Sequence, residues 1–120
     1  MPATIQPMLI TPDVIRLQAF YAQLLGAEQT VRVPDDGPVF FVTLRVKDSE
    51  IGLVANEKAP LGVPQRSLLS VMVDDVDALL DPVRDLGGQV LGPPNDMPWG
   101  QRVAHVKDPD GNALNLVQPI

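Results

Sequence analysis

The sequence predicts an α+β fold made of two copies of one strand–helix–strand–strand–strand unit. Two stripes of apolar residues at helical spacing recur in a fixed order with β-type segments, with a period of roughly 55–60 residues. Thirteen prolines and nine glycines divide the 120 residues into short elements. One such unit is too small to bury a sheet face alone. The two halves should therefore pack together, either within one chain or between chains.

The first predicted helix spans Val14–Leu25, where apolar residues recur every three or four positions. Thr11 can cap this helix, Pro12 suits its first turn, and Gly26 ends it. The rest of the first half is rich in β-branched and aromatic residues. We interpret it as four strands, Ile5–Ile10, Glu28–Val33, Val39–Val46 and Ile51–Ala55.

The second half repeats this order. A helix is predicted over Val76–Leu86, capped by Asp74 and Asp75, and the Pro-rich segment Gly92–Gly100 is predicted to be a loop. The predicted strands are Ser67–Val73, Gln89–Leu91, Gln101–Lys107 and Ala113–Gln118. We therefore expect one domain over 1–120, with module one at 4–56, a linker at 57–66 and module two at 67–118.

Composition excludes several classes of function. The net charge is −6 and the pI is near 4.4, so a nucleic-acid partner is not expected. No apolar run approaches the roughly 20 residues that cross a bilayer, and the N-terminus shows no secretory signal. The chain has no cysteine, which excludes disulfides and thiolate metal sites. These features lead us to expect a cytoplasmic protein without a membrane partner.

Three motifs in order connect the chain to a family. They are Phe20–Gly26 at the end of the first helix, Pro98–Arg102, and the turn Asp108–Asn112. Together they resemble the vicinal oxygen chelate superfamily, which includes glyoxalase I, extradiol dioxygenases, fosfomycin-resistance enzymes and bleomycin-binding proteins. The resemblance runs from Gln6 to Gln118. It implies βαβββ modules whose curved sheets form a half-open barrel around a cavity, commonly in a domain-swapped homodimer.

The resemblance also locates the family's metal ligands, which are His, Glu or Gln on the first and last strands of each module. The matching positions here are Gln6, Leu68 and Asn115, with the fourth near Gly52. Leucine and glycine have no donor side chain, and neutral amides bind divalent transition ions weakly. We therefore expect neither a metal ion nor another cofactor.

Trp99 and His105 are the sole tryptophan and histidine. Trp99 could contact a ligand from its loop, or it could simply pack that loop onto the sheet. His105 could bind a ligand or act as a general acid or base, although a lone histidine is more often structural. Seven further residues complete the candidate ligand-binding set, namely Gln6, Met8, Phe40, Leu68, Ser70, Met72 and Asn115.

Several other residues have more than one interpretation. Asn56 and Arg102 could orient a ligand, or they could lie on a solvated surface. Phe40 and Phe41 face opposite sides of one strand, so one of them should enter the cavity. The acidic trio Asp74, Asp75 and Asp77 suits the start of a helix and is given no catalytic role.

The expected function is a metal-free small-molecule binding protein of the glyoxalase and bleomycin-resistance type. Its ligand would be a small apolar or aromatic molecule, and the resemblance implies antibiotic sequestration as its role. Two alternatives remain open at this stage. One is a lyase, isomerase or dioxygenase-like enzyme with a non-standard site that uses His105, and the other is a dimer that serves protein interaction alone.

Overall fold

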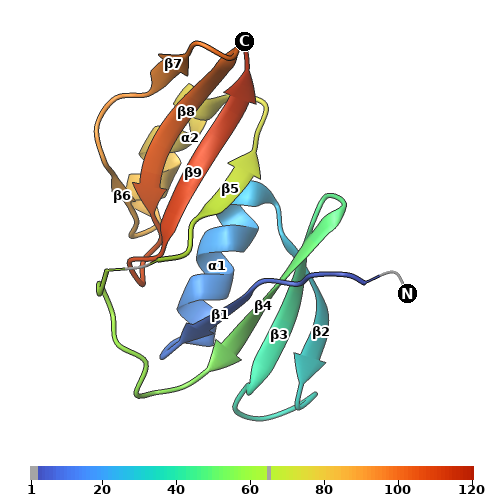
Figure 1. Cartoon of the computed structure of the whole chain (residues 1–120). Coiled ribbons are helices and arrows are strands. Elements are labelled where there is room, and N and C mark those ends of the chain that lie inside the picture. Colours follow the sequence, from blue (N-terminus) through green and yellow to red (C-terminus); the bar gives the residue numbers. More distant parts are fainter. Residues whose placement is uncertain (1–2, 65) are drawn as a thin grey trace. The chain divides into compact units, whose positions relative to one another are not determined.

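The computed structural model describes residues 3–64 and 66–120. Contacts divide the chain into one unit over Met1–Pro60 and another over Leu61–Ile120. Each unit has its own helix and its own sheet (Figure 1). The α+β prediction is confirmed, and neither of the two sheets in the described residues closes into a barrel by itself. The boundaries proposed for the domain, modules and linker remain predictions.

The first unit follows the predicted order of elements. Its sheet has the strand order β1-β4-β3-β2, with β1 parallel to β4 and the other pairs antiparallel. Its elements are β1 (Met8–Thr11), α1 (Val14–Leu25), β2 (Glu28–Val33), β3 (Phe41–Val46) and β4 (Ser49–Ala55).

The helix α1 covers one face of this sheet. Its stripe of buried side chains includes Leu17 and Phe20, which are 0% and 1% exposed. The sheet contributes Val42, Leu44 and Leu53, which are equally buried and alternate with residues of the other face. This alternation separates a core face from a second face, and the candidate Met8 belongs to the second.

The second unit has the strand order β5-β9-β8-β6, and β7 also pairs with β8. Here β5 is parallel to β9, while the other pairs are antiparallel. In Figure 1 the helix α2 lies behind β8 and β9. The elements are β5 (Leu69–Met72), α2 (Val76–Asp85), β6 (Gln89–Val90), β7 (Asn95–Met97), β8 (Gln101–Lys107) and β9 (Ala113–Pro119).

The core of the second unit is made in the same way. Val76 and Val83 of α2 are both 0% exposed, and alternate residues of β8 and β9 face them. These sheet residues are Ala104, Val106, Leu114 and Leu116. The intervening residues of the two strands, which include His105 and Asn115, therefore project from the opposite face.

The start of the first unit differs from the prediction in two ways. The strand β1 begins at Met8 rather than at Ile5, so Gln6 precedes the strand. The cap of α1 is Asp13, whose Oδ1 accepts from the backbone N–H of Arg16 at 3.0 Å. The prediction that Thr11 caps the helix and Pro12 occupies its first turn was wrong. Thr11 ends β1, and its Oγ1 accepts instead from the N–H of Asp13 at 3.1 Å.

The second unit also departs from the prediction. Residues 92–100 were predicted to form a loop, yet they contain the short strand β7, so the unit has one strand more than the repeat implied. The reason is non-local, because β7 exists only through its pairing with β8. The strand β5 begins at Leu69, which leaves Leu68 just before it. Neither helix in the described ranges is long and apolar enough to span a membrane.

Candidate functional site

A row of three residues crosses the first sheet on the face away from α1. Gly52 of β4 pairs with Met8 of β1 on one side and with Thr43 of β3 on the other. The Met8 side chain lies where a Cβ at position 52 would stand. Gln6 reaches the same place, since its Nε2 lies 3.4 Å from Oγ1 of Thr43 and 3.8 Å from Sδ of Met8. The structure thus brings Gln6 and Met8 together, as predicted, around a glycine.

A matching row crosses the second sheet on the face away from α2. Asn115 of β9 pairs with Ser70 of β5 on one side and with His105 of β8 on the other. Ser70 and His105 are exposed, and Asn115 is half-buried. Each row joins the first, last and next-to-last strands of its unit, so Asn115 occupies the place that Gly52 has in the first unit. Only the second unit therefore presents a row of polar side chains.

His105 and Asn115 form a direct hydrogen bond. The Nδ1 atom of His105 lies 2.7 Å from Oδ1 of Asn115. An amide oxygen accepts hydrogen bonds but cannot donate them, so this contact favours a proton on Nδ1. The Nε2 atom of a neutral imidazole then keeps its lone pair. The sequence could not reveal this pairing, because the two residues are neighbours only in the sheet.

An apolar row lies beside the polar one. Two positions along the same strands, Met72 pairs with Val117, which pairs with Val103. Met72 is 62% exposed, whereas Val117 and Val103 are buried. A molecule on this face would therefore meet the polar row beside one exposed apolar side chain, that of Met72. Val103 and Val117 were not among the predicted site residues, because only the register of β8 and β9 shows that they share this face.

Trp99 lies in the turn between β7 and β8. It is 67% exposed, and its Nε1–H donates to Oε1 of Gln101 at 2.8 Å. The turn is closed by a hydrogen bond from the N–H of Gly100 to the carbonyl of Met97 at 3.1 Å. The indole is thus anchored by its polar edge while most of its surface faces solvent. This arrangement contradicts the alternative in which Trp99 packs its loop onto the sheet of its unit.

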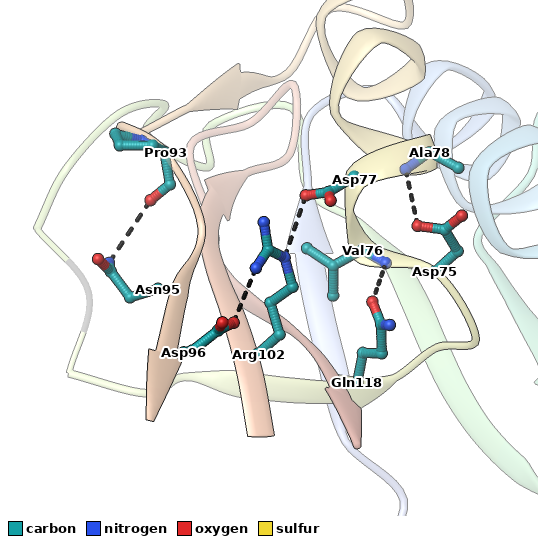
Figure 2. Close-up of polar contacts among 9 residues, drawn as sticks. All are labelled: Asp75, Val76, Asp77, Ala78, Pro93, Asn95, Asp96, Arg102 and Gln118. Atoms are coloured by element: carbon teal, nitrogen blue, oxygen red, sulfur yellow. Dashed lines mark hydrogen bonds and ion pairs between the residues drawn. The ribbon is translucent and has the colours of Figure 1, made fainter. Parts of the chain in front are cut away.

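Arg102 joins three elements of the second unit (Figure 2). Its Nη1 donates to Oδ1 of Asp96 on β7 at 2.8 Å, and its Nε donates to Oδ1 of Asp77 on α2 at 3.2 Å. The hydrogen bond that Arg102 donates to Asp96, followed by the one that it donates to Asp77, raises the pKa of Arg102 above its ordinary value. Arg102 points toward the helix side of the sheet. It therefore fixes the β7–β8 hairpin and does not lie in the polar row.

The remaining candidates lie apart from these rows. Phe40 precedes β3 and is 58% exposed. Its ring packs edge to face against that of Phe41, with 6.3 Å between the two ring centroids. Leu68 is 54% exposed. The Oδ1 atom of Asn56 accepts from the N–H of Lys58 at 3.0 Å, so this side chain closes a turn. The Oδ1 atom of Asp75 accepts from the N–H of Ala78 at 3.2 Å and caps α2, which agrees with the role predicted for it.

The residues at the family's metal positions do not suit a divalent ion. Gly52 offers no donor, and the thioether of Met8 fills the space beside it. Leu68 offers no donor either, and Oδ1 of Asn115 accepts from His105. Across residues 3–64 and 66–120, no three His, Cys, Asp or Glu side chains gather closely enough to hold a metal. This set lacks the anionic or imidazole ligands that bind such ions well.

A family model for the Glyoxalase/Bleomycin resistance protein/Dioxygenase superfamily matches residues 4–116. The chain belongs to this superfamily. The family assignment made from the three sequence motifs is thereby confirmed. It covers both units and accounts for their shared order of elements.

Curated relatives and solved structures agree with the superfamily assignment. Over 101 residues, or 84% of its length, the chain is 32% identical to a protein named "Putative glyoxylase CFP32" in Mycobacterium bovis and Mycobacterium tuberculosis. The chain spans only 38% of the length of that protein. It is also 29% identical over 122 residues to the uncharacterized protein YraH of Bacillus subtilis, covering 93% of this chain and 94% of YraH.

Two solved structures of resistance proteins share the fold. One is a bleomycin resistance determinant encoded on the transposon Tn5, with a TM-score of 0.71, 21% identity and 98% coverage of both chains. The other is the fosfomycin resistance protein FosX from Mesorhizobium loti, with a TM-score of 0.78 and 15% identity. It covers all of this chain and 94% of FosX. At these identities the likeness concerns the fold alone.

Proposed function

We propose that this superfamily member is a metal-free binding protein for a small apolar or aromatic molecule. The observation that carries the proposal is the donor set at the superfamily's metal positions. Two of these positions, Gly52 and Leu68, have no donor side chain, and the Asn115 amide is engaged with His105. The sheet faces at these positions are present, but they lack the imidazole and carboxylate side chains that would hold a metal ion as a Lewis acid.

The chemistry of the second unit supports an apolar or aromatic ligand. Met72 and Trp99 expose 62% and 67% of their surfaces. Thioether and indole groups adapt well to flat or irregular apolar molecules. A bleomycin resistance determinant has the same fold, so sequestration of an antibiotic is the role we propose.

The exposed apolar surface of the first unit supports a homodimer. Four apolar side chains share the face away from α1 and are 40% to 59% exposed, namely Met8, Ile10, Val31 and Val33. Apolar patches of this kind usually mark interaction sites. A homodimer in the cytoplasm, with neither a nucleic-acid nor a membrane partner, completes the proposal. Sedimentation equilibrium tests the dimer, and a monomer across the micromolar range would contradict that part.

Binding is tested by titrating the protein with a panel of bleomycin-type and other polycyclic drugs. Trp99 is the sole tryptophan, so its fluorescence reports on one place, and calorimetry reports binding anywhere else. We expect at least one drug to quench Trp99 saturably. Met72→Gln should weaken the binding of that drug about tenfold, because an apolar contact that is buried in the complex is lost.

Ile15→Gln is the matched control, because Ile15 on α1 is 63% exposed and Met72 is 62% exposed. It should leave the affinity unchanged. Equal weakening by both substitutions would point to a general loss of structure. If no drug binds by either method, the binding proposal fails, and a dimer that serves protein interaction alone becomes the better explanation.

The enzyme alternative rests on His105, whose bond to Asn115 leaves Nε2 with its lone pair. An imidazole in this state can act as a general base. A turnover assay over carbonyl, epoxide and phenol substrates would test this alternative. The control is Gln29→Leu, which alters an exposed residue of β2 in the first unit. Activity that is lost in His105→Ala and kept in Gln29→Leu would favour an enzyme over a binding protein.

A further inference from the structure

The polar row of the second unit restricts the chemistry of the molecule that it accepts. Asn115 Oδ1 holds Nδ1 of His105 at 2.7 Å, and only one ring nitrogen of a neutral imidazole carries a proton. The partner of one nitrogen decides the state of the other. With the proton on Nδ1, the Nε2 atom can accept a hydrogen bond but cannot donate one. A ligand that reaches Nε2 must therefore bring a donor.

The neighbouring residues distinguish between the possible donors. Lys107 lies two positions from His105 on β8, and its side chain projects from the same face. An ammonium group on the ligand would be repelled by Lys107, whereas a hydroxyl group carries no such penalty. On the other side, Met72 exposes 62% of its surface and offers an apolar contact above the buried Val117. Together these groups suit a hydroxyl attached to a flat apolar body.

We propose that the ligand class is a hydroxylated aromatic molecule, whose hydroxyl donates to Nε2 of His105 while its ring lies over Met72. This inference rests on the proposed binding function and narrows it. His105 is then a specificity-determining residue, and Asn115 is a positioning residue that acts through the imidazole. Ser70, at the far end of the row, is exposed and can bond a second polar group of the ligand.

The first experiment measures the proton position in the ligand-free protein. Because the chain has one histidine, nitrogen-15 correlation spectra at pH 8 contain a single imidazole. We expect Nδ1 to show the shift of a protonated nitrogen and Nε2 that of an unprotonated one. Asn115→Leu should move this balance toward a proton on Nε2. The control Gln29→Leu removes an exposed strand amide from the other unit and should leave it unchanged. A proton on Nε2 in the unmodified protein would overturn the inference.

The second experiment compares three naphthalenes of similar size. 2-Naphthol can donate, 2-methoxynaphthalene can only accept, and 2-methylnaphthalene can do neither. We expect 2-naphthol to bind about five- to tenfold more tightly than the other two, as for one hydrogen bond. It should also shift the Nε2 resonance. The preference should disappear in His105→Phe and persist in Gln29→Leu.

The outcomes separate this inference from the broader proposal. Equal affinities for the three naphthalenes would overturn the hydroxyl requirement and leave binding of apolar aromatics intact. Tighter binding of 2-methoxynaphthalene would mean that the site donates, which also overturns it. If none of the three binds, the inference fails, while the binding function is judged by the drug panel alone.

Discussion

Arg102 donates from Nη1 to Oδ1 of Asp96 at 2.8 Å and so joins β8 to β7 directly beside the turn that carries Trp99. Two strands that are linked only through a three-residue pairing need such a link to hold their turn still. A second bond from Nε to Asp77 ties the hairpin to α2. We therefore expect the orientation of the exposed indole to depend on the guanidinium of Arg102.

Replacing Arg102 with Met should mobilise Trp99 without unfolding the unit. Methionine keeps an unbranched apolar stem but removes both ion pairs. We expect faster nanosecond depolarisation of Trp99 fluorescence and weaker binding of any drug that quenches it. Arg84→Met is the control, because it removes one exposed ion pair of α2, that with Asp81 at 3.1 Å. Identical depolarisation in both variants would show that Arg102 does not hold the hairpin.

Replacing Asp108 with Ala should destabilise the turn between β8 and β9. Asp108 is 2% exposed, and its Oδ1 accepts from the backbone N–H groups of Asp110 and Asn112 at 3.0 and 2.9 Å. Loss of a charged acceptor leaves these N–H groups without a partner and should lower the free energy of unfolding by about 2–3 kcal/mol. Urea denaturation measures this loss. Asp108→Asn keeps one amide oxygen as an acceptor and should cost less; an equal cost would assign the effect to charge rather than to the turn.

Replacing Gly52 with Ala should reveal its contact with Met8. A Cβ at position 52 would overlap Sδ of Met8, which has a flexible side chain and can move aside. Gly52 lacks a positive φ, so alanine suits its backbone and lowers the entropy of the unfolded chain. We expect a net change within about 1 kcal/mol in the natural chain. In the Met8→Ala background the same substitution should become stabilising.

The difference between the two backgrounds is the coupling energy between positions 8 and 52. It should reach at least about 0.5 kcal/mol, the lower range for residues in contact. Differential scanning calorimetry of the four proteins provides the cycle. Additive effects would mean that the Met8 side chain does not lie across Gly52 in solution.

Divalent metal ions should not stabilise the protein. An ion at 1 mM that bound the folded state with a Kd of about 1 µM would add about 4 kcal/mol and raise the Tm by roughly 10–20 °C. We expect no change in Tm with Mn²⁺, Zn²⁺ or Ni²⁺ after treatment with a chelator. Elemental analysis of untreated protein should find well under one equivalent. A full equivalent of bound metal would contradict the proposal of a metal-free site.

Much of the candidate site could be predicted from the sequence, but its grouping could not. Five predicted candidates lie together in two groups, one in each unit. The first unit holds Gln6 and Met8, and the second holds Ser70, His105 and Asn115. Their role in binding remains a prediction. Thr43, Val103 and Val117 were missed, because a strand residue shows its face only once its partners are known.

The sequence by itself determined the two repeated units, both helices and most strands, because the spacing of apolar residues and the positions of glycine and proline are local signals. Only the tertiary structure decided which strands pair and in which register. The strand β7, the bond between His105 and Asn115, and the contact of Met8 with Gly52 all follow from that register. Backbone pairing joins residues far apart in the chain, so no local pattern specifies it.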